Sequence, residues 1–312
     1  MADDEGTILT SHISIQNYIV KFYKDLYSKH TCDYDKQTFF LSFLQNELSD
    51  DDRNLLCTPL SISEIYKTIK AMALNKTPGV DGIPIEFYVE NWEAISVDIL
   101  ALYNTVLQIG HLGRSQKRGI ITIIPKSNDT LHIRNYRPIS LLCTDYKILS
   151  KILSERIKLV LCRVINNKQF CGIPGRSINQ CNMEHRDIIQ YSNNSNQNMA
   201  VLKLDWYKAF NLVPVEFVFK VLQALGFGEK FVNWIKILYT GIESALEINS
   251  TISDFFPIHR SVRQGCPLSM SLFILFQEPF YRAVVANRII RPVKLPDSTD
   301  LKIPWDMRMT PL

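Results

Sequence analysis

Apolar residues recur at helical spacing in several stretches of the chain. In the stretch from Ile13 to Tyr27 lysines separate them, which predicts an amphipathic helix packed against a neighbour. Ser61 and Glu64 have the spacing of a capping box, and Ile65 and Ile69 continue an apolar stripe behind them. A helix is therefore predicted to begin at this serine, and both stretches are interpreted as scaffold.

The second half of the chain has the same helical pattern. Residues 213–239 predict two helices divided at Gly226 and Gly228, and residues 273–284 predict a long apolar helix in the core. Residues 245–256 between them predict a hairpin that leads into a loop at 263–267.

Two shorter apolar runs predict strands. Residues 120–124 form the first, which ends at Pro125 and Lys126, and Arg137 lies in a second strand that would complete a hairpin. The other run, at residues 200–204, is partly β-branched and predicts a buried strand that ends at Asp205.

Composition limits the class of protein. The chain has 312 residues, 46% hydrophobic and 21% charged, which is typical of a soluble globular protein. The formal net charge of +4 is too small to demonstrate a nucleic-acid partner. No apolar run reaches membrane-spanning length, and the acidic start lacks the apolar core of a secretory signal. Seven cysteines without a CxxC pair favour reduced thiols, so an intracellular protein is expected; nucleus or cytoplasm and the oligomeric state stay open.

Several residues could bind anions or cations. Asp205, at the end of a strand, could bind a divalent cation through its carboxylate, or it could simply cap the next segment. Lys126 and Arg137 on the hairpin could bind phosphate, or they could be ordinary solvated surface charges. The candidates for contact with a nucleic-acid backbone are basic residues of two Gly/Pro loops and of the predicted helix around 146–156: Lys76, Lys147, Lys151, Arg156 and Arg176.

Six segments in order carry a resemblance to a known family. They are KTPGVDGIPIEF, IPK, NYRPISL, QFCGIPGRS, LDWYKAF and RQGCPLS. Together they resemble the reverse transcriptase of a non-LTR retrotransposon, over residues from about Thr58 to about Arg291. The resemblance implies an α+β right-hand polymerase fold. Its parts would be an N-terminal helical extension at 1–57, fingers at 58–197 and an incomplete palm at 198–312.

The resemblance also implies roles for individual residues. Asp205 resembles the first metal-binding aspartate, which would be catalytic and would help to hold two Mg²⁺ ions. The residues expected around the incoming deoxynucleotide are Lys126, Arg137, Trp206, Phe210, Gln264 and Gly265. Lys76, Lys147, Lys151 and Arg176 are the predicted nucleic-acid-binding residues, with an RNA template and a DNA primer as partners. Asn211 stands where the family usually has aspartate, so a change in packing or hydrogen bonding is expected there.

The sequence departs from the family after Ile303. The family has a second palm strand ending in Tyr-Ala-Asp-Asp, whereas this chain continues with PWDMRMTPL. Read from the last base of the Trp305 codon, permitted codons spell Gly-Tyr-Ala-Asp-Asp, so we hypothesise a frameshifted tail from about residue 304; alternative splicing is the other explanation. The second pair of metal-binding aspartates is therefore missing. We expect a poorly soluble chain that is inactive in DNA synthesis. It would be a degenerate polymerase or a fragment of a longer reading frame, and the alternative is a non-catalytic nucleic-acid-binding remnant or a pseudogene product.

Overall fold

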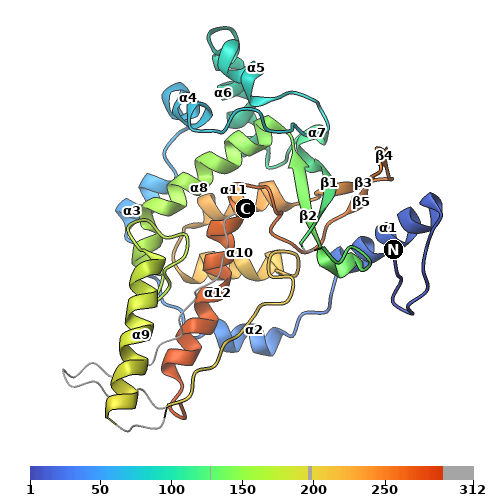
Figure 1. Cartoon of the computed structure of the whole chain (residues 1–312). Coiled ribbons are helices and arrows are strands. Elements are labelled where there is room, and N and C mark those ends of the chain that lie inside the picture. Colours follow the sequence, from blue (N-terminus) through green and yellow to red (C-terminus); the bar gives the residue numbers. More distant parts are fainter. Residues whose placement is uncertain (127, 196–198, 291–312) are drawn as a thin grey trace.

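The computed structural model describes residues 1–126, 128–195 and 199–290, and the chain folds as helices packed around one mixed sheet (Figure 1). This arrangement confirms the α+β class, while the division into fingers and palm stays a prediction. The described helices are, in chain order, α1 (His12–Tyr27), α2 (Tyr34–Leu41), α3 (Asp50–Leu56), α4 (Ile62–Lys70), α5 (Ile85–Glu90), α6 (Trp92–Ile109), α7 (Arg114–Lys117), α8 (Thr144–Val164), α9 (Ile178–Asn194), α10 (Val215–Ala224), α11 (Glu229–Tyr239) and α12 (Ser269–Ala286), with the short 3-10 helix η1 (Ile133–Asn135).

The sheet joins two distant parts of the chain. Its strands are β1 (Arg118–Pro125), β2 (Tyr136–Leu142), β3 (Glu243–Ile248), β4 (Thr251–Ile252) and β5 (Phe256–Pro257). β1 and β2 form the predicted antiparallel hairpin, and β3 runs parallel to β1 on its other side. The order is β2-β1-β3-β4, and β5 also pairs with β3. The hairpin is therefore held against a segment more than a hundred residues away in sequence.

The predicted helices are confirmed where the apolar stripe is strong. The Ser61 side chain accepts the Glu64 N–H at the start of α4, and Ile65 and Ile69 are fully buried. The division between α10 and α11 lies at Gly226 and Gly228, both with positive φ. Apolar periodicity predicted these elements because each has one face that must be covered.

The acidic run at residues 50–52 favours a polar break in the sequence, and that interpretation is wrong. These aspartates form the first turn of α3, where Ser49 and Asp52 form a capping box. Carboxylates are favourable at this end of a helix because the first amide N–H groups carry partial positive charge. The helix is only seven residues long, too short for its pattern to be recognised.

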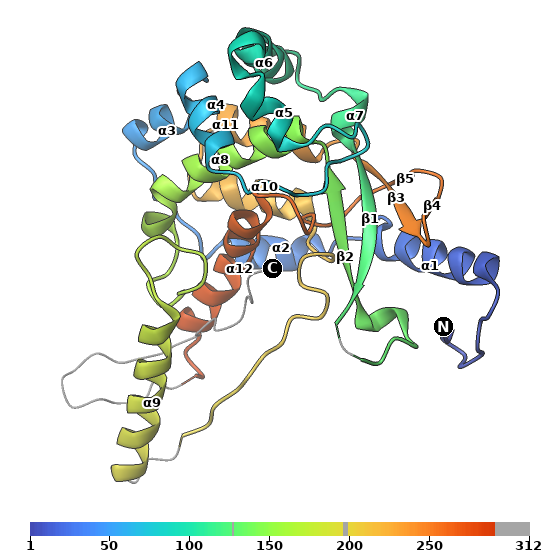
Figure 2. The same ribbon diagram turned by 45° about the horizontal axis from the view of Figure 1, so that its top comes forward.

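Buried apolar residues from α1 to α12 form one hydrophobic core. α8 crosses the molecule, with α4 to α6 near one end and α9 projecting beyond the other (Figures 1 and 2). Its residues Tyr146, Leu149, Leu153 and Ile157 are fully buried among the other helices. Among the described residues every helix is too short or too polar to cross a lipid bilayer.

The predicted buried strand at residues 200–204 is wrong in the structure. The segment is extended but belongs to no strand, and Figure 2 shows it crossing from the end of α9 towards α10. Val201, Leu202 and Leu204 are exposed, with Leu202 at 82%. A strand forms only where a neighbouring strand supplies its backbone hydrogen bonds, and none of the described strands pairs with this segment. The hypothesis of a frameshifted tail concerns residues outside the described ranges.

Candidate functional site

The β1–β2 hairpin presents the two predicted phosphate-binding residues at one end. Arg137 pairs with Ile124 in the ladder, and Lys126 follows β1 directly, so both lie near the turn. Both side chains are exposed. The Lys126 ammonium donates to the Arg134 carbonyl at 3.3 Å, and the Lys126 amide donates to the Asn135 carbonyl at 2.7 Å. The hairpin thus exposes both cations near its turn, and the binding of phosphate by them stays a prediction.

The loop that carries Gln264 and Gly265 packs against β2. The Ser140 amide donates to the Gln264 carbonyl at 2.7 Å. Gly265 has φ of +107°, and a Cβ there would lie 2.5 Å from the Ser140 carbonyl oxygen. The glycine was expected to let a backbone approach a ligand. In the structure the backbone that it approaches is the protein's own, which fixes the loop beside the hairpin.

The segment after Asp205 is attached to the same loop. The Val262 amide donates to the Phe210 carbonyl at 2.9 Å. The Phe210 ring stacks on Phe273 with centroids 4.9 Å apart, and the Trp206 ring contacts Phe280 at 5.6 Å. Main-chain hydrogen bonds therefore connect the segments that carry Phe210, Gln264 and Arg137, while the two aromatic rings pack on α12. A contact of Phe210 with a sugar stays a prediction.

Asn211 has a structural role. It is buried, and its amide donates to the Tyr27 hydroxyl at 2.6 Å. Burial raises the pKa of this tyrosine, so its hydroxyl remains protonated. The hydrogen bond attaches the end of α1 to the segment that follows Asp205, which accounts for a neutral amide at this position.

A cavity of about 350 Å³ brings three predicted nucleic-acid-binding lysines together. Lys76 comes from the first Gly/Pro loop, and Lys147 and Lys151 from α8. Burial lowers the pKa of Lys147, whose ammonium donates to the Thr77 carbonyl at 3.3 Å. Pro267 also lines this cavity, so it lies beside the loop that carries Gln264.

Two other basic residues face inward. Arg156 is 4% exposed and forms an ion pair with Glu64 at 2.7 Å, so it was wrongly included in the basic stripe. Arg176 donates to the carbonyls of Gln169 at 2.7 Å and Ile165 at 3.1 Å. These contacts hold the turn that follows α8. A role of Arg176 in nucleic-acid binding stays a prediction.

The described residues do not form a complete metal site around Asp205. This side chain is exposed. Within the described ranges, one group of three possible ligands lies close enough to hold an ion: Asp81, Cys143 and Asp145, within 4.8 Å of one another. Burial raises the pKa of the Cys143 thiol to about 12, and the Gln116 amide donates to Asp145 at 2.8 Å. A protonated thiol does not suit a hard ion such as Mg²⁺, so this second group does not fit it either.

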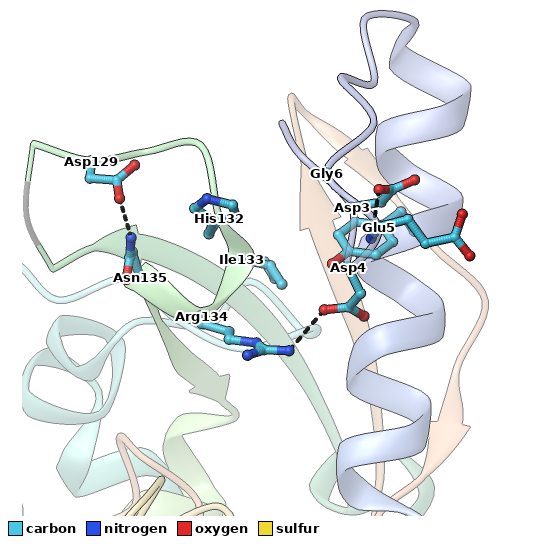
Figure 3. A pocket seen from close by; sticks show the side chains of 10 residues that line it. Asp3, Asp4, Glu5, Gly6, Asp129, His132, Ile133, Arg134 and Asn135 are labelled. Atoms are coloured by element: carbon cyan, nitrogen blue, oxygen red, sulfur yellow. Dashed lines mark hydrogen bonds and ion pairs between the residues drawn. The ribbon is translucent and has the colours of Figure 1, made fainter.

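A second cavity, of about 660 Å³, was not predicted from the sequence. Figure 3 shows it between the start of the chain and the turn of the hairpin. Its lining includes four acidic side chains, Asp3, Asp4, Glu5 and Asp129, and Arg134, which pairs with Asp4. Neither this lining nor that of the lysine cavity includes Asp205. The acidic residues at the start of the chain were visible in the sequence, but nothing in the sequence indicated that they would lie beside the hairpin turn.

The sequence of this chain is similar to a known protein family and to several known proteins. The family described as reverse transcriptase (RNA-dependent DNA polymerase) matches residues 124–291. The chain is 34% identical over 277 residues to the transposon TX1 uncharacterized 149 kDa protein of Xenopus laevis, covering 89% of this chain and 21% of that protein.

Two Drosophila melanogaster proteins are also similar. The retrovirus-related Pol polyprotein from type-2 retrotransposable element R2DM is 25% identical over 243 residues, covering 78% of this chain and 22% of that protein. The probable RNA-directed DNA polymerase from transposon BS is 27% identical over 160 residues, covering 50% of this chain and 17% of that protein. The chain thus spans about a fifth of the length of these relatives.

Proposed function

The chain belongs to the reverse transcriptase (RNA-dependent DNA polymerase) family, and we propose that it is the part of a non-LTR retrotransposon polymerase that holds RNA template, DNA primer and incoming deoxynucleotide. The similarity to a transposon protein and to a Pol polyprotein of a retrotransposable element supports this proposal. The right-hand polymerase fold, with a helical extension, fingers and palm, is part of the same proposal.

The observation that carries the proposal is the cavity lined by Lys76, Lys147 and Lys151. Lys76 is brought onto α8 from a loop about seventy residues earlier in the chain. Three lysine side chains that line one cavity favour phosphate, and a nucleic-acid backbone supplies phosphates at regular intervals. Apolar residues complete the lining, among them Met72, Ile85 and Pro267. The cavity is thus suited to a backbone phosphate with part of a sugar or base.

The incoming nucleotide would bind on the neighbouring surface. There Arg137 could form paired hydrogen bonds with a phosphate, while Lys126 would act as a point charge. Gln264 has a buried side-chain oxygen without a hydrogen-bond partner among the described residues, so it can accept a hydrogen bond from a ligand. Trp206, Phe210 and Gly265 belong to the segments that border this surface.

Divalent ions serve catalysis in this family, and we infer that Asp205 is one ligand and that the ion is Mg²⁺. When bound, the ions would activate a primer hydroxyl and stabilise the leaving pyrophosphate. The described residues supply no set of carboxylates around Asp205, so the part that they play in the reaction is to bind and orient the nucleic acid and the nucleotide.

The incomplete set of carboxylates around Asp205 among the described residues favours a second candidate function. A chain that binds nucleic acid without synthesising DNA would be a non-catalytic remnant of the same family. RNA binding without primer extension would distinguish this remnant from an active polymerase. Absence of any binding would leave a pseudogene product.

The test is binding of a fluorescent RNA–DNA hybrid by the full chain, measured by anisotropy over a range of salt concentrations. We expect Lys147→Gln and Lys151→Gln each to weaken binding and to reduce the slope of log K against log salt by about 1. Lys24→Gln, which removes an exposed charge from α1, is the matched control. Equal effects of all three substitutions would contradict a phosphate site at this cavity.

A further inference from the structure

The start of the chain folds back on itself and docks on the turn of the hairpin. Within residues 1–9, the Leu9 amide donates to the Met1 carbonyl at 2.7 Å, and the Asp3 amide to the Thr7 carbonyl at 3.0 Å. Ala2 is 4% exposed, and its amide donates to the Leu131 carbonyl at 2.8 Å. The segment therefore has a defined position on the hairpin turn.

The docked segment places acidic side chains against a basic one. Asp3, Asp4 and Glu5 follow one another, and an Asp4 carboxylate oxygen lies 3.0 Å from an Arg134 nitrogen (Figure 3). The two side chains are 58% and 64% exposed. Exposed ion pairs contribute little to stability, so a more highly charged anion could replace this carboxylate without unfolding the hairpin.

Arg134 belongs to a cluster of three cations. The Lys126 ammonium donates to its carbonyl at 3.3 Å, and Lys208 lies close enough for both neighbouring charges to act on it. Burial, followed by the charges of Lys126 and Arg134, lowers the pKa of Lys208 to about 8. The Lys208 ammonium also lies 3.9 Å from the centroid of the Phe22 ring. Mutual repulsion of the three cations is reduced when an anion lies among them.

We propose that the acidic segment Asp3–Glu5 is an intramolecular competitor for phosphate: Asp4 pairs with Arg134 beside Lys126, and a ligand phosphate displaces it. The inference rests on the proposed function, which places phosphate at Lys126, and it adds Arg134 to that site. A phosphate has more acceptor oxygens than a carboxylate and, in a nucleotide, more charge. It is therefore the stronger ligand for several cations at once.

The phosphate could belong to a nucleotide or to a nucleic-acid backbone. Two binding measurements on the full chain distinguish these sources, one with a single-stranded RNA oligonucleotide and one with a deoxynucleoside triphosphate and magnesium. We expect Asp4→Asn to tighten binding of at least one probe about two- to fivefold, because the competing carboxylate is removed. Arg134→Gln should weaken binding of the same probe.

The control is Asp98→Asn, which removes an exposed charge from α6. If Asp4→Asn has no more effect than this control while Arg134→Gln weakens binding, the cluster binds phosphate but the segment does not compete, and the inference is wrong. If Lys147→Gln weakens RNA binding while Asp4→Asn and Arg134→Gln change neither probe, the inference fails and the proposed function stands. If the unchanged chain binds neither probe, both fail.

Discussion

Gly265 shows how the absence of a side chain at one residue lets the loop of Gln264 pack against β2. Its positive φ is a conformation that favours glycine, and its close contact with Ser140 leaves no room for a Cβ. We expect Gly265→Ala to lower the free energy of unfolding by about 1–3 kcal/mol more than Gly175→Ala, because only the first adds a steric clash. Gly175 has φ of +77° but no atom within 4 Å of an added Cβ, so it controls for backbone strain. Chemical denaturation measures both, and equal losses would contradict the packing described.

Lys208 provides a test of the cation cluster through pH. Its pKa is lowered from 10.5 to about 8 in the folded chain, so the unfolded chain binds more protons between these values. Stability contributed by this residue should therefore rise as the pH increases from about 8 to about 10.5. We expect the free energy of unfolding of the unchanged chain to rise relative to that of Lys208→Met across this range. Parallel curves would show that Lys208 is not perturbed.

Residue type and spacing identified several of the candidate residues. The lysines of the cavity and the two cations of the hairpin were identified because basic residues recur beside loops and on one helix. The inward position of Arg156 was not predictable, because its partner Glu64 is 92 residues away in sequence. The pairing of Asp4 with Arg134 spans 130 residues and has no local signal either.

Among the elements, the end of α8 is held by Arg176 together with Arg282, which donates to the Val164 carbonyl at 2.8 Å. Arg176 donates to main-chain carbonyls near this end, including that of Ile165. We expect Arg176→Ala to lower the free energy of unfolding by about 1–3 kcal/mol, because the carbonyls lose their donor. Its slope of RNA affinity against salt should stay unchanged. Arg186→Ala, on exposed α9, is the control for loss of an arginine. A reduced slope with unchanged stability would instead support direct nucleic-acid binding.

Elements with their own apolar pattern were predicted, whereas those that depend on a partner were not. α1, α4, α10, α11 and α12 and the β1–β2 hairpin follow from periodicity and turn residues. The parallel pairing of β1 with β3 depends on the tertiary fold and left no pattern in the sequence. The run at 200–204 has strand composition, but a strand forms only where another strand supplies its hydrogen bonds.

For the molecule as a whole, we expect nucleic-acid binding but no DNA synthesis. The described residues gather cations for phosphate but supply no carboxylate set around Asp205. We expect the purified 312-residue chain to show no Mg²⁺-dependent primer extension on an RNA template, and Asp205→Ala to leave that result unchanged. A gel assay with labelled primer measures this directly. Extension that Asp205→Ala abolishes would contradict the expectation.

RNA is expected to lie against the cavity of Lys76, Lys147 and Lys151. Photocross-linking of a 4-thiouridine RNA to the full chain, followed by mass spectrometry of the linked peptides, tests it most directly. We expect linked peptides from the loop around Lys76 and from the first half of α8, with their yield falling as salt is raised. Cross-links confined to other surfaces, such as α9 or α11, would contradict it.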